Sequence, residues 1–196
     1  MILHLIRHPK PLIEPGICYG QLDVAAENPV ATAERLRAEL LPGLSPGFTL
    51  WSSPLRRCRE LAEVLAEMLA EVQPERLTDS SNSSHSSVQL DARLMEMNFG
   101  AWEGRPWDLV PRSQLDAWAA DVEGYAPPGG ESPYQLRERV LEFVGGLGDG
   151  EHVLVTHAGV IRLLLAHAAA ASIADSLRHT PDYGSLTTLR LPASFP

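Results

Sequence analysis

The residues best placed to carry out chemistry are two arginines and two histidines that follow predicted strands. Arg7 and His8 come directly after the largely apolar run 2–6, and His157 directly follows the run 152–156. Arg57 lies shortly after a predicted strand over 48–51. In an open α/β sheet, strand ends face one crevice in which ligands bind. We therefore expect these four side chains to meet in one pocket.

Two arginines, two imidazoles and one carboxylate in such a pocket would suit phosphoryl transfer through a covalent intermediate. A neutral imidazole is nucleophilic near pH 7, and one ring nitrogen can attack while a backbone carbonyl holds the other. Arginine provides forked donors that match phosphate oxygens. A second, protonated histidine and a carboxylic acid complete the set. The candidates for this acid are Asp91, Glu96 and Glu103.

Length and composition indicate an ordinary globular protein. The chain has 196 residues, of which 44% are hydrophobic, and a formal net charge of -9. This length fits a single domain over 1–196. The acidic charge and the lack of a basic stripe argue against a nucleic-acid partner. A small anionic substrate is compatible with this charge, because surface charges beyond about 8 Å are largely screened.

The two cysteines and the lengths of the apolar runs indicate the cellular compartment and whether a metal site is present. Cys18 and Cys58 have no CxxC or Cys/His ligand spacing, so we expect free thiols in a reducing compartment and no metal site. No apolar run reaches membrane-spanning length, and Met1 leads into apolar residues without a basic leader segment. We therefore expect a cytoplasmic protein without a membrane partner.

The hydrophobic pattern predicts alternating strands and helices. Their order predicts a three-layer α/β/α sandwich with a mostly parallel sheet and an antiparallel edge strand at the end of the chain. The serine-rich run 78–87 is predicted to be a flexible loop, and 97–128 an irregular, cap-like segment. The expected strands cover 2–6, 48–51, 88–90, 152–156 and 185–191, and the expected helices cover 30–41, 54–72, a stretch from Pro106, 113–122, 132–144 and 160–171.

Five short motifs occur in a recognisable order along nearly the whole chain. Together they resemble the histidine phosphatase superfamily, which has the phosphoglycerate-mutase-like fold. The FGAWEG and PPGGES elements and the short length are most similar to α-ribazole phosphatases of the cobalamin pathway. The motifs are Leu5-Ile6-Arg7-His8, Ser53-Pro54-Leu55-Arg56-Arg57, the run LMEMNFGAWEG over 94–104, Pro128-Gly129-Gly130-Glu131-Ser132 and Val155-Thr156-His157-Ala158-Gly159.

The resemblance assigns roles to individual residues. It implies that His8 forms a phosphohistidine, that Glu96 rather than Glu103 is the acid, and that no metal or other cofactor is used. Arg57, rather than Arg56, would hold the phosphoryl group of a small phosphorylated metabolite together with Arg7 and His157. Further substrate contacts are implied for Gly20, Gln21 and Ala158.

The chain departs from the family pattern directly after the nucleophile. Where the family has Gly-x-Thr, this sequence has Pro9-Lys10-Pro11, so any phosphate contact from the amides of residues 9 and 11 is lost. Outside the motif set, we interpret His4 as a hydrogen-bonded core or subsite residue and His85 and His152 as surface residues. Trp102 is interpreted as a packing residue that could also line the leaving-group side.

Three other functions remain open at this point. A phosphoglycerate-mutase-type transferase would use the same fold, although mutases typically carry longer chains with an added segment near the active site. A broad-specificity phosphatase would use the same catalytic residues. A phosphate-binding sensor would bind without turnover, which the intact set of candidate residues argues against.

Overall fold

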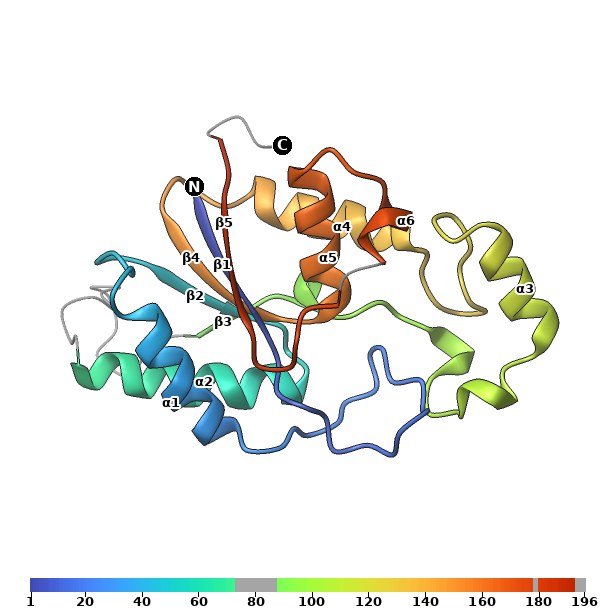
Figure 1. The fold of residues 1–196 in the computed structure, drawn as a ribbon, viewed down its shortest axis with the longest axis horizontal. Helices are drawn as coiled ribbons and strands as arrows, with labels where there is room; N and C mark the ends of the chain where they lie inside the picture. Colours follow the sequence, from blue (N-terminus) through green and yellow to red (C-terminus); the bar gives the residue numbers. More distant parts are fainter. Residues whose placement is uncertain (73–87, 178–179, 193–196) are drawn as a thin grey trace.

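A computed structural model describes residues 1–72, 88–177 and 180–192, which form a mixed α/β fold around a five-stranded sheet (Figure 1). The strand order is β3-β2-β4-β1-β5. The pairs β1–β4, β4–β2 and β2–β3 are parallel, whereas β5 is an antiparallel edge strand beside β1. The predicted fold class is therefore confirmed. The strands are β1 (Ile2–Arg7), β2 (Thr49–Ser52), β3 (Gln89–Leu90), β4 (Glu151–Thr156) and β5 (Leu186–Arg190).

Helices cover both faces of the sheet, with α1 and α2 on one side and α4 and α5 on the other (Figure 1). Successive residues of a strand point to opposite faces. On β4, Val153 and Val155 accordingly pack with α1 and α2, whereas Leu154 packs with α4 and α5. The sheet is thus buried on both faces. The helices are α1 (Pro29–Leu40), α2 (Arg56–Val72), α4 (Pro133–Gly145) and α5 (Ala158–Ala168).

The carboxyl ends of three parallel strands lie at one edge of the sheet. Arg7 is in register with Thr156, and Ser52 with Val155. The ladder continues one residue further, because the amide of His8 donates to the carbonyl of Thr156 at 3.0 Å. The chain segments that leave β1, β2 and β4 therefore start side by side.

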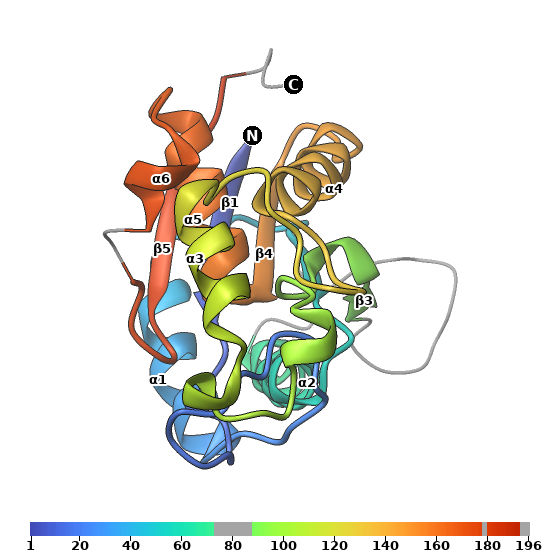
Figure 2. The same ribbon diagram turned by 90° about the vertical axis from the view of Figure 1, so that its right-hand side faces the viewer.

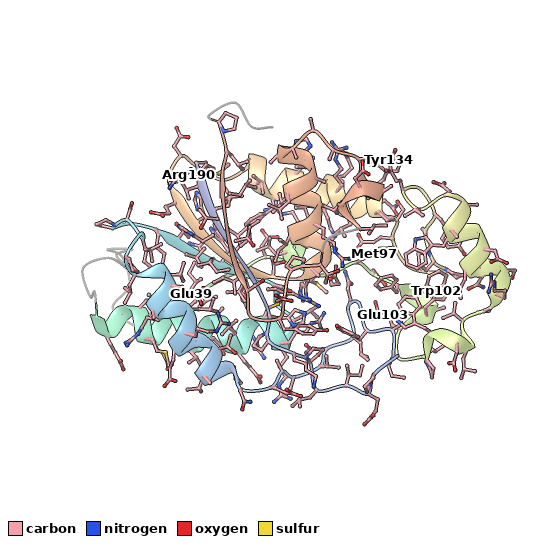
Figure 3. The ribbon with its side chains drawn as sticks, in the orientation of Figure 1. Glu39, Met97, Trp102, Glu103, Tyr134 and Arg190 are labelled. Carbon is pink, nitrogen blue, oxygen red and sulfur yellow. The ribbon has the colours of Figure 1, made fainter. Side chains whose placement is uncertain are left out.

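The segment 97–128 forms an arm beside the sheet that carries helix α3 (Arg112–Ala120) (Figure 2). Trp102 is the centre of its apolar cluster, with only 1% of its surface exposed, and lies within this arm in Figure 3. Its indole N–H donates to Gln114 Oε1 at 2.6 Å. Trp102 therefore packs, and the alternative role on the leaving-group side is not observed. One short 3-10 turn, Ala92–Leu94, precedes the arm, and two more, Gly100–Trp102 and Trp107–Leu109, lie within it.

Several expected boundaries are wrong for local reasons. Helix α2 begins at Arg56 instead of residue 54, because the Ser53 hydroxyl accepts from the Leu55 amide in a turn that precedes the helix. The stretch from Pro106 is a 3-10 turn, α5 ends at Ala168, and the short helix α6 (Ile173–Ser176) was not expected.

Two expectations concern histidines outside the motifs. His152 is 7% exposed and bonds to the Gly148 carbonyl, so the expectation of a surface residue is wrong. His85 and the serine-rich loop lie outside the described residues. In the described parts of the chain, no helix is both long and apolar enough to span a bilayer.

Candidate active site

His8 is held in the orientation and charge state that a nucleophile needs. It is 2% exposed, and its Nδ1 lies 2.6 Å from the carbonyl of Pro9. A carbonyl can only accept, so Nδ1 carries the proton and Nε2 keeps its lone pair. Burial lowers the pKa of His8 to about 3, and the charge of Arg57, more than that of Arg7, acts in the same direction. His8 is therefore neutral at pH 7.

The proline that breaks the family pattern thus contributes a contact of its own. The amide of residue 9 cannot donate to a phosphate, but its carbonyl fixes the imidazole of His8. The departure from the motif is compatible with the predicted chemistry of His8.

Arg57 is fully buried in the first turn of α2. Its Nη1 and Nη2 donate to the carbonyls of Leu22 and Gly20 at 2.9 and 2.6 Å. Arg7 is 8% exposed and donates to the Pro181 carbonyl at 2.5 Å. In both guanidinium groups Nε is buried without a partner. A buried charged donor without an acceptor is costly, so this arrangement is the one expected where an anion binds.

Two tyrosines lie over these cations. The Arg7 guanidinium lies 3.7 Å from the ring centre of Tyr183, and that of Arg57 lies 5.5 Å from the ring centre of Tyr19. The two hydroxyls are hydrogen-bonded at 2.9 Å. Burial and this hydrogen bond raise the pKa of Tyr19. The tyrosine pair therefore joins two loops that are far apart in the sequence.

His157 lies directly beside His8, with the two ring centres 5.1 Å apart. It is fully buried at the N-terminus of α5, and its Nε2 lies 2.8 Å from Ser53 Oγ. Burial lowers the pKa of His157 well below its ordinary value, helped by the charge of Arg57. Burial, with the charge of Arg57, therefore disfavours the protonated second histidine that the sequence predicts. A neutral His157 can still donate one hydrogen bond.

Glu96 is the acid candidate that reaches the pocket. Its carboxylate accepts from the amides of Met97 and Gly159 at 2.9 and 3.1 Å. A Cβ on Gly159 would clash with Glu96 Oε1, so the carboxylate keeps this position because residue 159 is a glycine. The other two candidates are committed elsewhere. Glu103 accepts from the amides of Gln21 and Phe99, and Asp91 pairs with Arg93.

The candidate residues surround a pocket of about 190 Å³ between the sheet edge and the arm. Arg57 and His157 are fully buried and are not part of its wall. The expected substrate contacts Gly20 and Ala158 are in the wall. The side chain of Gln21 instead donates to the Glu96 carbonyl at 3.0 Å, which positions the acid. The wall consists of Arg7, His8, Ile17, Tyr19, Gly20, Glu96, Phe99, Trp107, Ala158, Arg162 and Thr180.

Several participants carried no sequence signal that would have revealed their roles. Arg139 donates to the Glu96 carbonyl from α4, and its charge is balanced by Glu131 at 2.7 Å. Arg162 lines the pocket, and the ring centre of Tyr183 lies 5.7 Å from that of His8; both residues come from segments without a predicted role. Ser53 belongs to a recognised motif, but its contact with His157 was not expected. Among the described residues, no group of three or more His, Cys, Asp or Glu side chains could hold a metal ion.

Comparison with known proteins places these residues in a family. Residues 3–194 match the sequence profile of the histidine phosphatase superfamily, branch 1. The chain is 33% identical over 180 residues to the glucosyl-3-phosphoglycerate phosphatase of Mycolicibacterium vanbaalenii, covering 84% of this chain and 72% of the relative. It is 35% identical over 86 residues to the adenosylcobalamin/alpha-ribazole phosphatase of Escherichia coli (strain K12). This second match covers 40% of this chain and only 42% of the relative.

A solved structure supports the fold assignment. The alpha-ribazole phosphatase from Shigella flexneri superposes with a TM-score of 0.77 at 24% identity, covering 100% of this chain and 93% of that chain. At this identity the likeness concerns the fold alone.

Proposed function

Because this chain belongs to branch 1 of the histidine phosphatase superfamily, we propose that it hydrolyses a small phosphomonoester through a phosphohistidine at His8, without a metal ion. One observation carries the proposal. His8 is neutral, its Nδ1 is tied to a carbonyl, and its ring lies 5.1 Å from that of His157 with buried arginines nearby. An imidazole held in this way leaves Nε2 as the attacking atom.

The first step transfers the phosphoryl group to the enzyme. Nε2 of His8 attacks phosphorus, and the N–P bond forms while the ester P–O bond breaks. The electron pair of that bond goes to the leaving oxygen, which takes the proton carried by Glu96. Arg7 and Arg57 stabilise the charge on the remaining phosphoryl oxygens, and His157 adds one hydrogen-bond donor.

The second step releases phosphate. The Glu96 carboxylate takes a proton from a water molecule, and the water oxygen attacks phosphorus as the N–P bond breaks. Inorganic phosphate leaves, and both His8 and Glu96 return to their starting states. Reversal of the role of Glu96 follows from general acid–base reciprocity.

The substrate that we propose is α-ribazole 5′-phosphate, in a cytoplasmic step of cobalamin biosynthesis. The Escherichia coli relative supports this choice over the matched part of the chain. The Mycolicibacterium relative, which is matched over a larger part of its length, makes phosphorylated glycerates the comparison substrates.

A substrate panel tests the proposal. Phosphate release is measured with α-ribazole 5′-phosphate, glucosyl-3-phosphoglycerate and 3-phosphoglycerate, and we expect the highest kcat/KM for the first. Formation of 2-phosphoglycerate that depends on a bisphosphate primer would instead identify a mutase. Phosphate binding without turnover of any ester would identify a sensor.

Trapping the intermediate tests the chemistry independently of the natural substrate. With 4-nitrophenyl phosphate labelled in phosphorus, rapid quenching should give protein-bound label that is stable to base and labile to acid. The label should be absent from His8→Asn. Label of the same stability in His8→Asn would place the covalent intermediate elsewhere.

A further inference from the structure

A second pocket, of about 150 Å³, adjoins the catalytic pocket. Its wall is mostly apolar and comes from the arm and from α4, α5 and α6. The two charged side chains in the described wall are Glu96 and Arg162. The principal apolar residues are Phe99, Trp118, Leu136, Leu163, Ile173 and Leu177.

The two pockets share part of their walls. Glu96, Phe99 and Arg162 line both of them. The two residues whose amides hold the Glu96 carboxylate, Met97 and Gly159, also belong to the second wall. Figure 3 shows Met97 between the sheet and the arm. The acid therefore stands at the junction of the two pockets.

The proposed reaction predicts on which side of the phosphoryl group the alcohol half of the substrate lies. In-line transfer places the leaving oxygen on the side of phosphorus opposite Nε2 of His8. Glu96 protonates that oxygen, so the alcohol half of the substrate begins at Glu96. Glu96 also lines the apolar pocket, so this pocket lies on the leaving-group side of the proposed reaction.

We propose that this apolar pocket, here called the alcohol pocket, binds an aromatic ring of the alcohol half of the substrate. The inference rests on the proposed function and adds a substrate class to it. Its size supports the ring, since an apolar cavity of about 150 Å³ lined by Leu, Ile and Phe binds benzene. A glycerate would leave its carboxylate and hydroxyl groups without partners against this wall.

The position of Leu177 makes the pocket testable without disturbing the core. Leu177 is 44% exposed, whereas Leu163 and Leu136 in the same wall are 5% and 2% exposed. A carboxylate at 177 would stay partly hydrated yet would make the pocket unfavourable for an aromatic ring. Leu90 on β3 is 49% exposed and is absent from this wall, so it offers a matched control.

The test compares two alkyl phosphates, 2-phenylethyl phosphate and ethyl phosphate, whose leaving oxygens are chemically alike. We expect kcat/KM to be roughly 100-fold higher for the phenylethyl ester, on the scale of burying one aromatic group. Leu177→Asp and Trp118→Ala should each lower this ratio about tenfold. Leu90→Asp should keep the wild-type ratio.

The outcomes separate the two proposals. Equal kcat/KM for both esters, or a ratio that Leu177→Asp leaves unchanged, overturns the alcohol pocket while phosphatase activity stands. If neither ester is hydrolysed, the pocket is tested by binding of the two corresponding phosphonates, measured by calorimetry, and the substrate panel above decides the function proposal separately. Binding of 2-phenylethylphosphonate at least tenfold tighter than ethylphosphonate supports the pocket, and equal binding overturns it.

Discussion

His4 and His8 are both buried and lie four residues apart, but they differ in their hydrogen-bond partners and in the charges around them. His4 lies within β1, with Glu151 Oε1 2.6 Å from Nε2 and Thr188 Oγ1 3.0 Å from Nδ1. His8 lies just beyond the end of β1 and has one nitrogen tied to Pro9, with arginines as its charged neighbours. Both ring nitrogens of His4 are hydrogen-bonded, so this imidazole links β1 to β4 and β5. The imidazole of His8 keeps a lone pair for chemistry.

The partners of each histidine also determine its electrostatics. Burial alone would raise the pKa of Glu151, but hydrogen bonds from His4 and Ser45 outweigh it and hold that pKa below its usual value. Around His8, burial and the arginines act together, so the pKa falls to about 3. A carboxylate neighbour thus gives His4 a structural hydrogen bond, whereas burial among cationic neighbours leaves His8 neutral.

Replacing each histidine with alanine should give the largest difference between the two sites. His8→Ala removes the attacking atom, so we expect kcat for 4-nitrophenyl phosphate to fall on the order of 10⁴-fold or more. His4→Ala should leave kcat within a few-fold but lower the free energy of unfolding by about 3 kcal/mol, because Glu151 would be buried without its partner. Steady-state kinetics and urea unfolding measure the two effects. Near-normal kcat in His8→Ala would end the nucleophile assignment.

Arg57→Gln tests how the positive charge beside His8 affects catalysis and the pKa of His8. Loss of this phosphoryl clamp should lower kcat on the order of 10³-fold. It should also raise the pKa of His8, because the charge of Arg57 is the second largest cause of its depression. The imidazole ¹⁵N shifts, followed by NMR against pH, report this pKa. The exposed neighbour Arg56, paired with Glu60, is the matched control, and Arg56→Gln should change neither quantity.

Glu96→Gln tests which group handles the leaving oxygen. A poor leaving group depends on the proton, so we expect about a 10²- to 10³-fold loss for an alkyl phosphate and a smaller loss of the phosphorylation rate with 4-nitrophenyl phosphate. Single-turnover kinetics separates this rate from phosphohistidine hydrolysis, which should slow for both esters. Equal losses of the phosphorylation rate would count against the acid role.

The smallest expected effect is on stability in acid. Because His8 has a folded pKa of about 3 and an ordinary value of 6.5, the unfolded chain binds more protons between these values. Stability therefore falls as pH drops through this window. In His8→Asn that part of the loss disappears, so between pH 6.5 and 4.5 this variant should lose roughly 2 kcal/mol less than the wild type. Unfolding by urea at several pH values measures this difference, and parallel curves would contradict it.

Parts of the site followed from local pattern. Apolar runs ending in Arg7-His8 and in His157 predicted strand ends, and parallel strand ends meet at one edge of a sheet. The choice of Glu96 over Glu103 came from family resemblance, and the structure gives it a reason, since Glu103 is occupied with two backbone amides. The contacts of Arg139 and Tyr183 could not be predicted, because distant segments bring them to the site.

The sequence by itself determined the order of the strands and of most helices and the placement of the candidate residues at strand ends, because apolar periodicity and turn residues act over a few neighbouring positions. Only the tertiary structure decided the charge states of His8 and His157, since these depend on burial and on arginines from separate elements. It also decided the apolar wall beside Glu96, which the arm and α4, α5 and α6 build together. Electrostatics and packing act through space, so residues distant in the chain set both.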